Sequence, residues 1–136
     1  MRAFGLIVAI ALLGGCATAG RSDGAPSRSF AGTHWTIASL NGAPPAAARK
    51  TAITFDIDRI SGNAGCNSFG GGYSVAGSVM TVTQVISTKM ACMGAGMDQE
   101  DAFFKILATP MTIAWKDDGS VILSDDAGSV TLAPAS

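Results

Sequence analysis

The stretch that decides the fold is AITFDIDRISGNAGCNSFGGGYSVAGSVMTVTQV, residues 52–85. It begins with a strict alternation in which apolar Ile53, Phe55 and Ile57 are separated by polar residues. Successive side chains of a β-strand point to opposite faces, so this alternation predicts a strand with one buried and one exposed side. We therefore expect the three apolar side chains to face a hydrophobic core.

The same stretch predicts three more strands. The chain turns at Asp58-Arg59 and can return as a second strand with small residues on its inner side, which predicts that a bulky group packs closely there. The inward positions of this second strand are Ile60, Gly62, Ala64 and Cys66. Tyr73 and Val75 precede a turn at residues 76–78, and residues 79–85 continue as a further strand.

The flanking regions add strands and one helix. Residues 33–40 place Trp35 and Ile37 on one side of a strand. Residues 97–108, MDQEDAFFKILA, predict a helix with an acidic N-terminal part, an apolar face and Pro110 beyond its end. That face is Phe103, Phe104, Ile106 and Leu107, and the acidic residues are Asp98, Glu100 and Asp101. Three short strands follow, MTIAWK, SVILSD and SVTLAP, separated by turns at 117–119 and 125–128.

These elements predict a mainly β protein. Seven or eight short antiparallel strands with one helix fit a small antiparallel barrel or half-barrel. We expect the helix, at about residues 97–108, to cover an open end or face of the barrel.

The N-terminus resembles a bacterial lipoprotein signal. Arg2 precedes an apolar run, residues 3–13, that is shorter than the roughly 20 residues needed to span a bilayer. The run ends in LGGC, residues 13–16, which resembles a lipobox. The resemblance implies cleavage after residue 15 and a lipid on Cys16.

We therefore divide the chain into a signal peptide (1–15), a lipidated flexible tether (16–31) and one folded domain (32–136). The tether is rich in small and polar residues, which cannot bury enough apolar surface to order themselves. A lipidated Cys16 would anchor the protein to a membrane without crossing it. Ala17, in place of the Asp that favours inner-membrane retention, indicates the outer membrane, facing the periplasm.

The charge excludes one class of partner. Cleavage would leave 121 residues (136 minus 15) with 8 Lys+Arg (9 minus Arg2) against 10 Asp+Glu. A net charge near −2 argues against nucleic-acid binding, which requires clustered basic residues. The length suits one domain with a modest core, and we expect a monomer.

Two cysteines remain once Cys16 is assigned to lipid. In an oxidising compartment Cys66 and Cys92 are expected to form a disulfide, which would contribute about 3–4 kcal/mol of stability. The alternative is a nucleophilic Cys66 with His34 as its base and Asn67 as the orienting group. His34 is the single histidine, so no metal site is expected.

Three further patterns have two interpretations each. The Gly70–Gly72 run could cradle a phosphate, but it lacks the Lys and helix of a P-loop, so we expect it to permit positive φ at a tight corner. The acidic pairs 117–118 and 125–126 could bind calcium, but they lack the ligand pattern of a calcium loop and are typical of solvated turns. Asn67 is expected to hold the local turn after Cys66; the alternative is contact with a ligand.

Taken in order, these segments resemble the META domain, the family of the heat-inducible lipoprotein HslJ. The resemblance covers about residues 33–133 and depends on two motifs, SGNAGCNSFGGGY and STKMAC, followed by an acidic helix with FFKIL. The first motif contributes Gly62, Gly65, Cys66, Asn67, Phe69, Gly71 and Tyr73, and the second contributes Ser87, Thr88, Met90, Ala91 and Cys92.

The resemblance implies a protein without catalytic activity or cofactor, connected with envelope stress or drug tolerance. We therefore expect a non-catalytic, membrane-anchored envelope lipoprotein that binds another envelope protein or a small apolar ligand. Two alternatives stay open. One is an inhibitor of an extracytoplasmic hydrolase that presents the 42–50 loop or the 67–72 corner, and the other is a carrier with a lipid or small molecule inside the barrel.

Overall fold

The computed structural model describes residues 28–46 and 51–136. The predicted signal peptide, Cys16 and residues 17–27 of the predicted tether lie outside the described residues. Within them the chain forms eight strands and one helix. The strands are β1 (Thr33–Leu40), β2 (Ala52–Phe55), β3 (Arg59–Asn63), β4 (Ser68–Ala76), β5 (Val79–Ser87), β6 (Met111–Trp115), β7 (Val121–Asp125) and β8 (Gly128–Pro134), and helix α1 (Ala95–Leu107) lies between β5 and β6.

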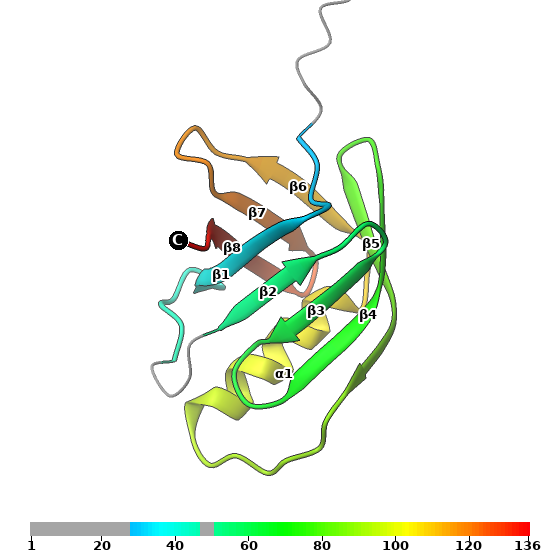
Figure 1. The fold of residues 1–136 in the computed structure, drawn as a ribbon. Coiled ribbons are helices and arrows are strands. Elements are labelled where there is room, and N and C mark those ends of the chain that lie inside the picture. Colours follow the sequence, from blue (N-terminus) through cyan, green and yellow to red (C-terminus); the bar gives the residue numbers. More distant parts are fainter. Residues whose placement is uncertain (1–27, 47–50) are drawn as a thin grey trace, which may run out of the picture.

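The described strands form a closed antiparallel barrel in chain order, in which β8 returns to pair with β1 (Figure 1). Across this closing pair Trp35 lies opposite Pro134, and Leu40 lies opposite Val130. The predicted fold class, a mainly β protein with a small antiparallel barrel and one helix, is confirmed. Closure pairs the first strand with the last, so neither is left as an open sheet edge.

Side chains fill the barrel interior. Ile53 and Phe55 are buried, as the alternation in β2 predicts. Helix α1 lies across one end of the barrel and inserts Phe103, Ile106 and Leu107 into the same core (Figure 1). The largest fully buried side chains are Phe55, Phe103, Ile53, Ile60, Met80, Ile106, Leu107, Met111, Leu123, Leu132, Val121 and Val130.

One seam of the barrel is short. In the described chain β5 pairs with β6 at only two positions, Val79 with Thr112 and Met80 with Met111. The reason is that the chain enters β6 from α1, so β6 begins level with Met80 and runs away from the later part of β5. The second half of β5 therefore pairs with β4 alone.

Two expectations about the core differ from the structure. Ile57, expected to face inward, is 88% exposed, because β2 ends at Phe55 and the chain turns before β3. Phe30, expected to lie in the tether, is buried against Phe55 and Trp115. Burial of a large aromatic side chain stabilises the folded state relative to leaving it exposed to solvent. The packed domain therefore begins before the expected Gly32.

Candidate functional site

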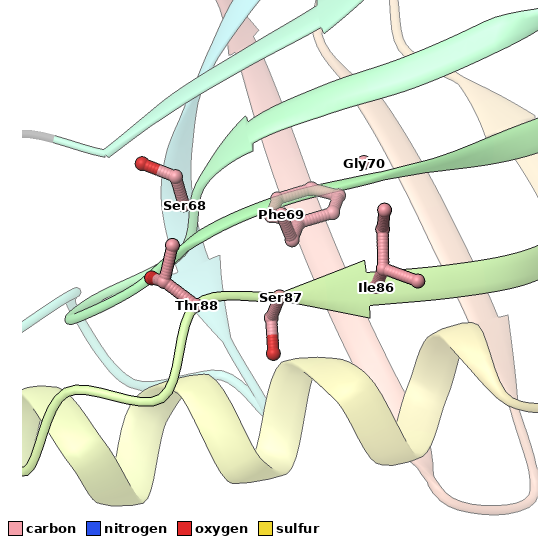
Figure 2. A pocket seen from close by; sticks show the side chains of 6 residues that line it. All are labelled: Ser68, Phe69, Gly70, Ile86, Ser87 and Thr88. Atoms are coloured by element: carbon pink, nitrogen blue, oxygen red, sulfur yellow. The ribbon is translucent and has the colours of Figure 1, made fainter.

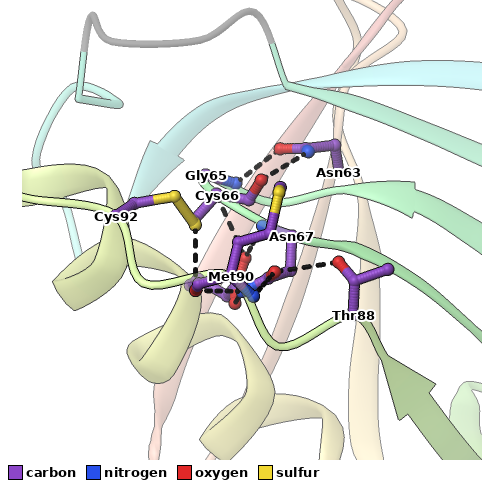
Figure 3. Close-up of a disulfide and its surroundings, with 8 residues drawn as sticks. Asn63, Gly65, Cys66, Asn67, Thr88, Met90 and Cys92 are labelled. Atoms are coloured by element: carbon purple, nitrogen blue, oxygen red, sulfur yellow. Dashed lines mark hydrogen bonds between the residues drawn. A yellow bond between two sulfur atoms is a disulfide. The ribbon is translucent and has the colours of Figure 1, made fainter.

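The structure contains the predicted disulfide between Cys66 and Cys92, whose Cα atoms are 6.0 Å apart. Cys66 lies in the loop between β3 and β4 and is fully buried, whereas Cys92 lies in the segment between β5 and α1. Figure 3 shows the bond joining these two loops at the end of the barrel that α1 covers. Because the sulfur of Cys66 is bonded to Cys92, it is not available here as a thiolate nucleophile.

Asn67 connects the disulfide loop to the chain after β5. Its Oδ1 accepts hydrogen bonds from Thr88 Oγ1 at 2.8 Å and from the Met90 backbone N–H at 2.7 Å. Its Nδ2 donates to the Met90 carbonyl at 3.3 Å (Figure 3) and to Glu100 Oε1 at 2.8 Å. Asn67 is expected to hold the turn just after Cys66, but its side-chain hydrogen bonds all go to residues at least 21 positions away in the sequence.

Glu100 of α1 completes this buried network. Its Oε2 accepts hydrogen bonds from the backbone N–H groups of Cys66, at 3.1 Å, and of Asn67. Together with the bond from the Asn67 side chain, the carboxylate therefore accepts three hydrogen bonds while only 3% exposed. Among the described residues no buried side-chain N or O atom lacks a partner, so this polar cluster is fully satisfied and can stabilise one arrangement of the loops.

The local turn around Cys66 depends on a different asparagine. Asn63 Oδ1 accepts a hydrogen bond from the Gly65 N–H at 3.0 Å, and its Nδ2 donates to the Cys66 carbonyl at 3.1 Å (Figure 3). Gly65 is required here because a Cβ would lie 2.3 Å from the carbonyl oxygen of Gly96 in α1. A Cβ at Gly96 would lie 3.2 Å from the Gly65 carbonyl oxygen, so the close approach of the helix to the loop depends mainly on Gly65.

Two other motif glycines also allow close backbone contact. At Gly62, where φ is 151°, a Cβ would lie 1.9 Å from the Ala52 carbonyl oxygen. At Gly71 a Cβ would lie 2.8 Å from the Thr83 carbonyl oxygen, at a β-bulge between β4 and β5. The expected tight corner at Gly70–Gly72 is wrong: none of the three has positive φ, and all lie within β4, while Gln84 on β5 carries the positive φ, 51°.

The aromatic residues of the first motif lie on β4 and pack against different parts of the protein. Phe69 is buried edge-on against Phe103 and Phe104 of α1, with ring centroids 5.5 and 5.6 Å apart. Tyr73 donates from its hydroxyl to the Asp56 carbonyl at 2.8 Å. Burial, followed by the charges of Asp56 and Asp58, raises the pKa of the Tyr73 phenol above its usual value of 10.0.

Residues of the second motif line two surface grooves. Figure 2 shows the first, of about 310 Å³, lined by β4 residues beside Phe69 and by Ile86, Ser87 and Thr88. The second, of about 230 Å³, shares Ser87 and Thr88 with the first. Its lining includes Asn67, Lys89, Met90, Ala91, Met97, Glu100, Asp101 and Phe104.

Exposed large apolar side chains are concentrated in the same segment of the chain, where Ile86 lines the first groove and Met90 the second. Among the described residues seven large apolar side chains are exposed, and four of them lie in the nine residues from Val85 to Met93. They are Val85, Ile86 (71%), Met90 and Met93 (98%). We call these four residues and the two grooves the distal surface. The disulfide and the Asn67–Glu100 network fix its backbone to the barrel.

The other sequence candidates lie elsewhere. His34 is exposed on β1 beside Thr54, with its Nδ1 3.1 Å from the threonine Oγ1. Asp118 Oδ1 accepts from the Ser120 hydroxyl and backbone N–H, and these bonds lower the pKa of the Asp118 carboxyl. Asp125 Oδ1 accepts from two backbone N–H groups of its own turn, so both acidic pairs make the hydrogen bonds of ordinary turns.

The comparisons with known proteins agree with this arrangement. A family model described as the META domain matches residues 28–136. The chain belongs to the META-domain family. The matched range includes Phe30 and every residue of the two motifs, and it begins where the packed domain begins in the structure.

Two solved structures show the same fold. An NMR structure of a protein from Burkholderia xenovorans has 21% sequence identity and a TM-score of 0.64, over 79% of this chain and 84% of that one. A second NMR structure has 18% identity and a TM-score of 0.67, over 77% of this chain and 91% of that one. A search of the curated proteins gives no match. In the part of the META-domain chain that the structure describes, no helix has the length and apolar character to cross a membrane.

Sequence reasoning missed the role of Glu100. The acidic residues at the start of the helix were interpreted through the helix dipole, but Glu100 points into the protein together with Gln99, whose Nε2 donates to the Ala64 carbonyl at 2.6 Å. A signal was present: both residues fall on the same helical face as Phe103, three and four positions away.

Proposed function

We propose that this META-domain protein is a non-catalytic, membrane-anchored lipoprotein of the cell envelope. It acts in the envelope stress response or in drug tolerance by binding another envelope protein through its distal surface, and it resides at the outer membrane, facing the periplasm. The lipobox at residues 13–16 and Ala17 support the anchor and its location, and the family supports the connection with stress.

One observation carries the binding role. The barrel interior is filled by buried side chains, while the distal surface exposes Ile86 and Met93 on a backbone that is held in place. Exposed apolar side chains that are grouped and fixed are typical of interaction sites. The methionines can adapt to the shape of a partner, because their side chains are unbranched and polarisable.

The same observations disfavour the two alternatives. A carrier would need space for its ligand inside the barrel, where the core cluster already lies. An inhibitor would need a protruding loop, but residues 68–72 belong to β4 and Asn67 is buried. The other candidate loop, 42–50, lies partly outside the described residues.

Site-specific photo-crosslinking in intact cells tests this function. A photoreactive amino acid at Met93 should give a discrete adduct with one envelope protein, and the same residue at exposed Thr112 on β6 should not. Ile86→Asp should remove the Met93 adduct, whereas Thr112→Asp, which adds the same charge elsewhere, should leave it intact. Equal labelling from both positions, or none from Met93, would contradict a distal binding site.

A further inference from the structure

The other three exposed large apolar side chains of the described residues lie at the opposite end of the barrel. Ile57 occupies the turn between β2 and β3, Val75 lies near the end of β4, and Val79 begins β5 directly after the hairpin. These three residues form what we call the proximal surface. Val79 lies opposite Ala76 and Ile86 opposite Gly70, six residues apart on β4, so the two surfaces are separated by about 20 Å at 3.4 Å per residue.

The proximal surface lies where the described chain begins. Arg28–Ala31, Ile57 and Tyr73–Val75 line one shallow pocket of about 220 Å³. Arg28 is held there by a hydrogen bond to the Lys116 carbonyl and by stacking over Trp115, 5.5 Å from the ring centroid. The chain that leads back to Cys16 therefore leaves the barrel beside Ile57 and Val75.

The length of that chain limits where the domain can be. Twelve residue steps separate Cys16 from Arg28 (28 minus 16), and whatever their conformation they span no more than about 43 Å. A linker this short keeps the domain at a millimolar effective concentration next to the surface that holds Cys16. A patch too small to bind a bilayer from solution can therefore bind it when tethered.

We propose that the proximal surface docks on the lipid bilayer and inserts Ile57 into its interface, which directs the distal surface away from the membrane. This inference rests on the proposed lipidation of Cys16. The charged side chains at this end nearly cancel, so apolar contact rather than anionic lipid provides the attraction. They are Arg28, Arg59 and Lys116 against Asp56, Asp58, Asp117 and Asp118.

Fluorescence quenching on vesicles tests this docking. The full lipidated protein is reconstituted in phosphatidylcholine vesicles that contain nitroxide-labelled lipid, with a small fluorophore on Ser74→Cys or on Met93→Cys. We expect the Ser74 label to be quenched much more strongly than the Met93 label. Ile57→Ser should lower the ratio of docked to undocked protein about tenfold, because most of one isoleucine side chain is then no longer buried in the bilayer. Ile86→Ser, the matched change on the distal surface, should have no effect, and neither should 0.5 M salt.

The outcomes separate the docking from the anchor. If mass spectrometry shows that Cys16 is lipidated, then equal quenching of both labels, or quenching that Ile57→Ser leaves unchanged, overturns the docking. A chain whose mass shows no lipid on Cys16 overturns the anchor and the docking with it. Because Ile57 is largely exposed, its replacement should not change the melting temperature, which is measured on the same samples.

Discussion

Replacing Glu100 by glutamine tests whether the buried network stabilises the fold. The carboxylate offers Oε2 to two backbone N–H groups and Oε1 to the Asn67 amide, but a glutamine side chain has only one oxygen. Asn67 cannot reverse its amide to compensate, because its Oδ1 already accepts hydrogen bonds from Thr88 and Met90. At least one buried donor must then face another donor.

The expected cost is about 2–3 kcal/mol, from one unsatisfied buried donor and the loss of hydrogen bonds to a charged group. For a domain of this size that corresponds to a fall in melting temperature of about 8–15 °C, measured by circular dichroism. Asp101→Asn removes the same charge from the adjacent, exposed position and should cost less than about 0.5 kcal/mol.

A double-mutant cycle locates the cause. In an Asn67→Ala background one of the competing donors is gone, so Glu100→Gln should cost about 1 kcal/mol less than it does in the wild-type protein. If Glu100→Gln were as mild as Asp101→Asn, or if its cost were unchanged without the Asn67 amide, the reasoning about the network would be refuted.

Three other outcomes are expected. Cys66→Ser and Cys92→Ser should each lower the free energy of unfolding, measured with urea, by about 3–4 kcal/mol; unequal losses would indicate a separate role for one sulfur. The intact mass of the wild-type protein should rise by two hydrogens on reduction. Gly65→Ala should cost at least about 2 kcal/mol through overpacking, whereas Gly70→Ala, whose Cβ would meet its nearest neighbour at 3.5 Å, should be tolerated; equal melting temperatures would contradict this. Tyr73 is the single tyrosine, and its raised pKa should place the midpoint of its absorbance titration above pH 10.0. Because the folded pKa exceeds the unfolded one, the contribution of Tyr73 to stability is present below the unfolded pKa and is lost as pH rises through the folded pKa. A Tyr73→Phe variant that loses the same stability at alkaline pH would contradict this role of Tyr73.

The sequence predicts the elements of this fold well because most of them are set by local patterns. Ile53 and Phe55 alternate with polar residues, and Phe103, Ile106 and Leu107 recur at helical spacing, so strand, helix and core position follow from periodicity. Ile57 continues the same alternation but is exposed, because periodicity does not indicate where a strand ends. Phe30 shows the opposite limit, since an aromatic residue in a polar segment can still join the core.

The site is less predictable because it depends on contacts between distant segments. The pairing of Cys66 with Cys92 follows from counting, but the role of Glu100 depends on the helix lying across the loop after β3. The glycine run shows the same effect: Gly71 is needed because β5 bulges beside it, and that bulge depends on Gln84, which no local rule identifies. In the sequence, a site of close backbone approach is marked only by a glycine, and a turn can be marked by a glycine as well.

The pairing of β1 with β8 has a consequence for how the molecule is made. Trp35 and Leu40 acquire their partners on β8 only after the last residues of the chain have emerged, since those partners are Pro134 and Val130. Contacts this far apart slow folding, because a long loop must close before they form. The barrel of a newly synthesised chain thus cannot close until the chain is complete, which would suit the export that we propose for this protein.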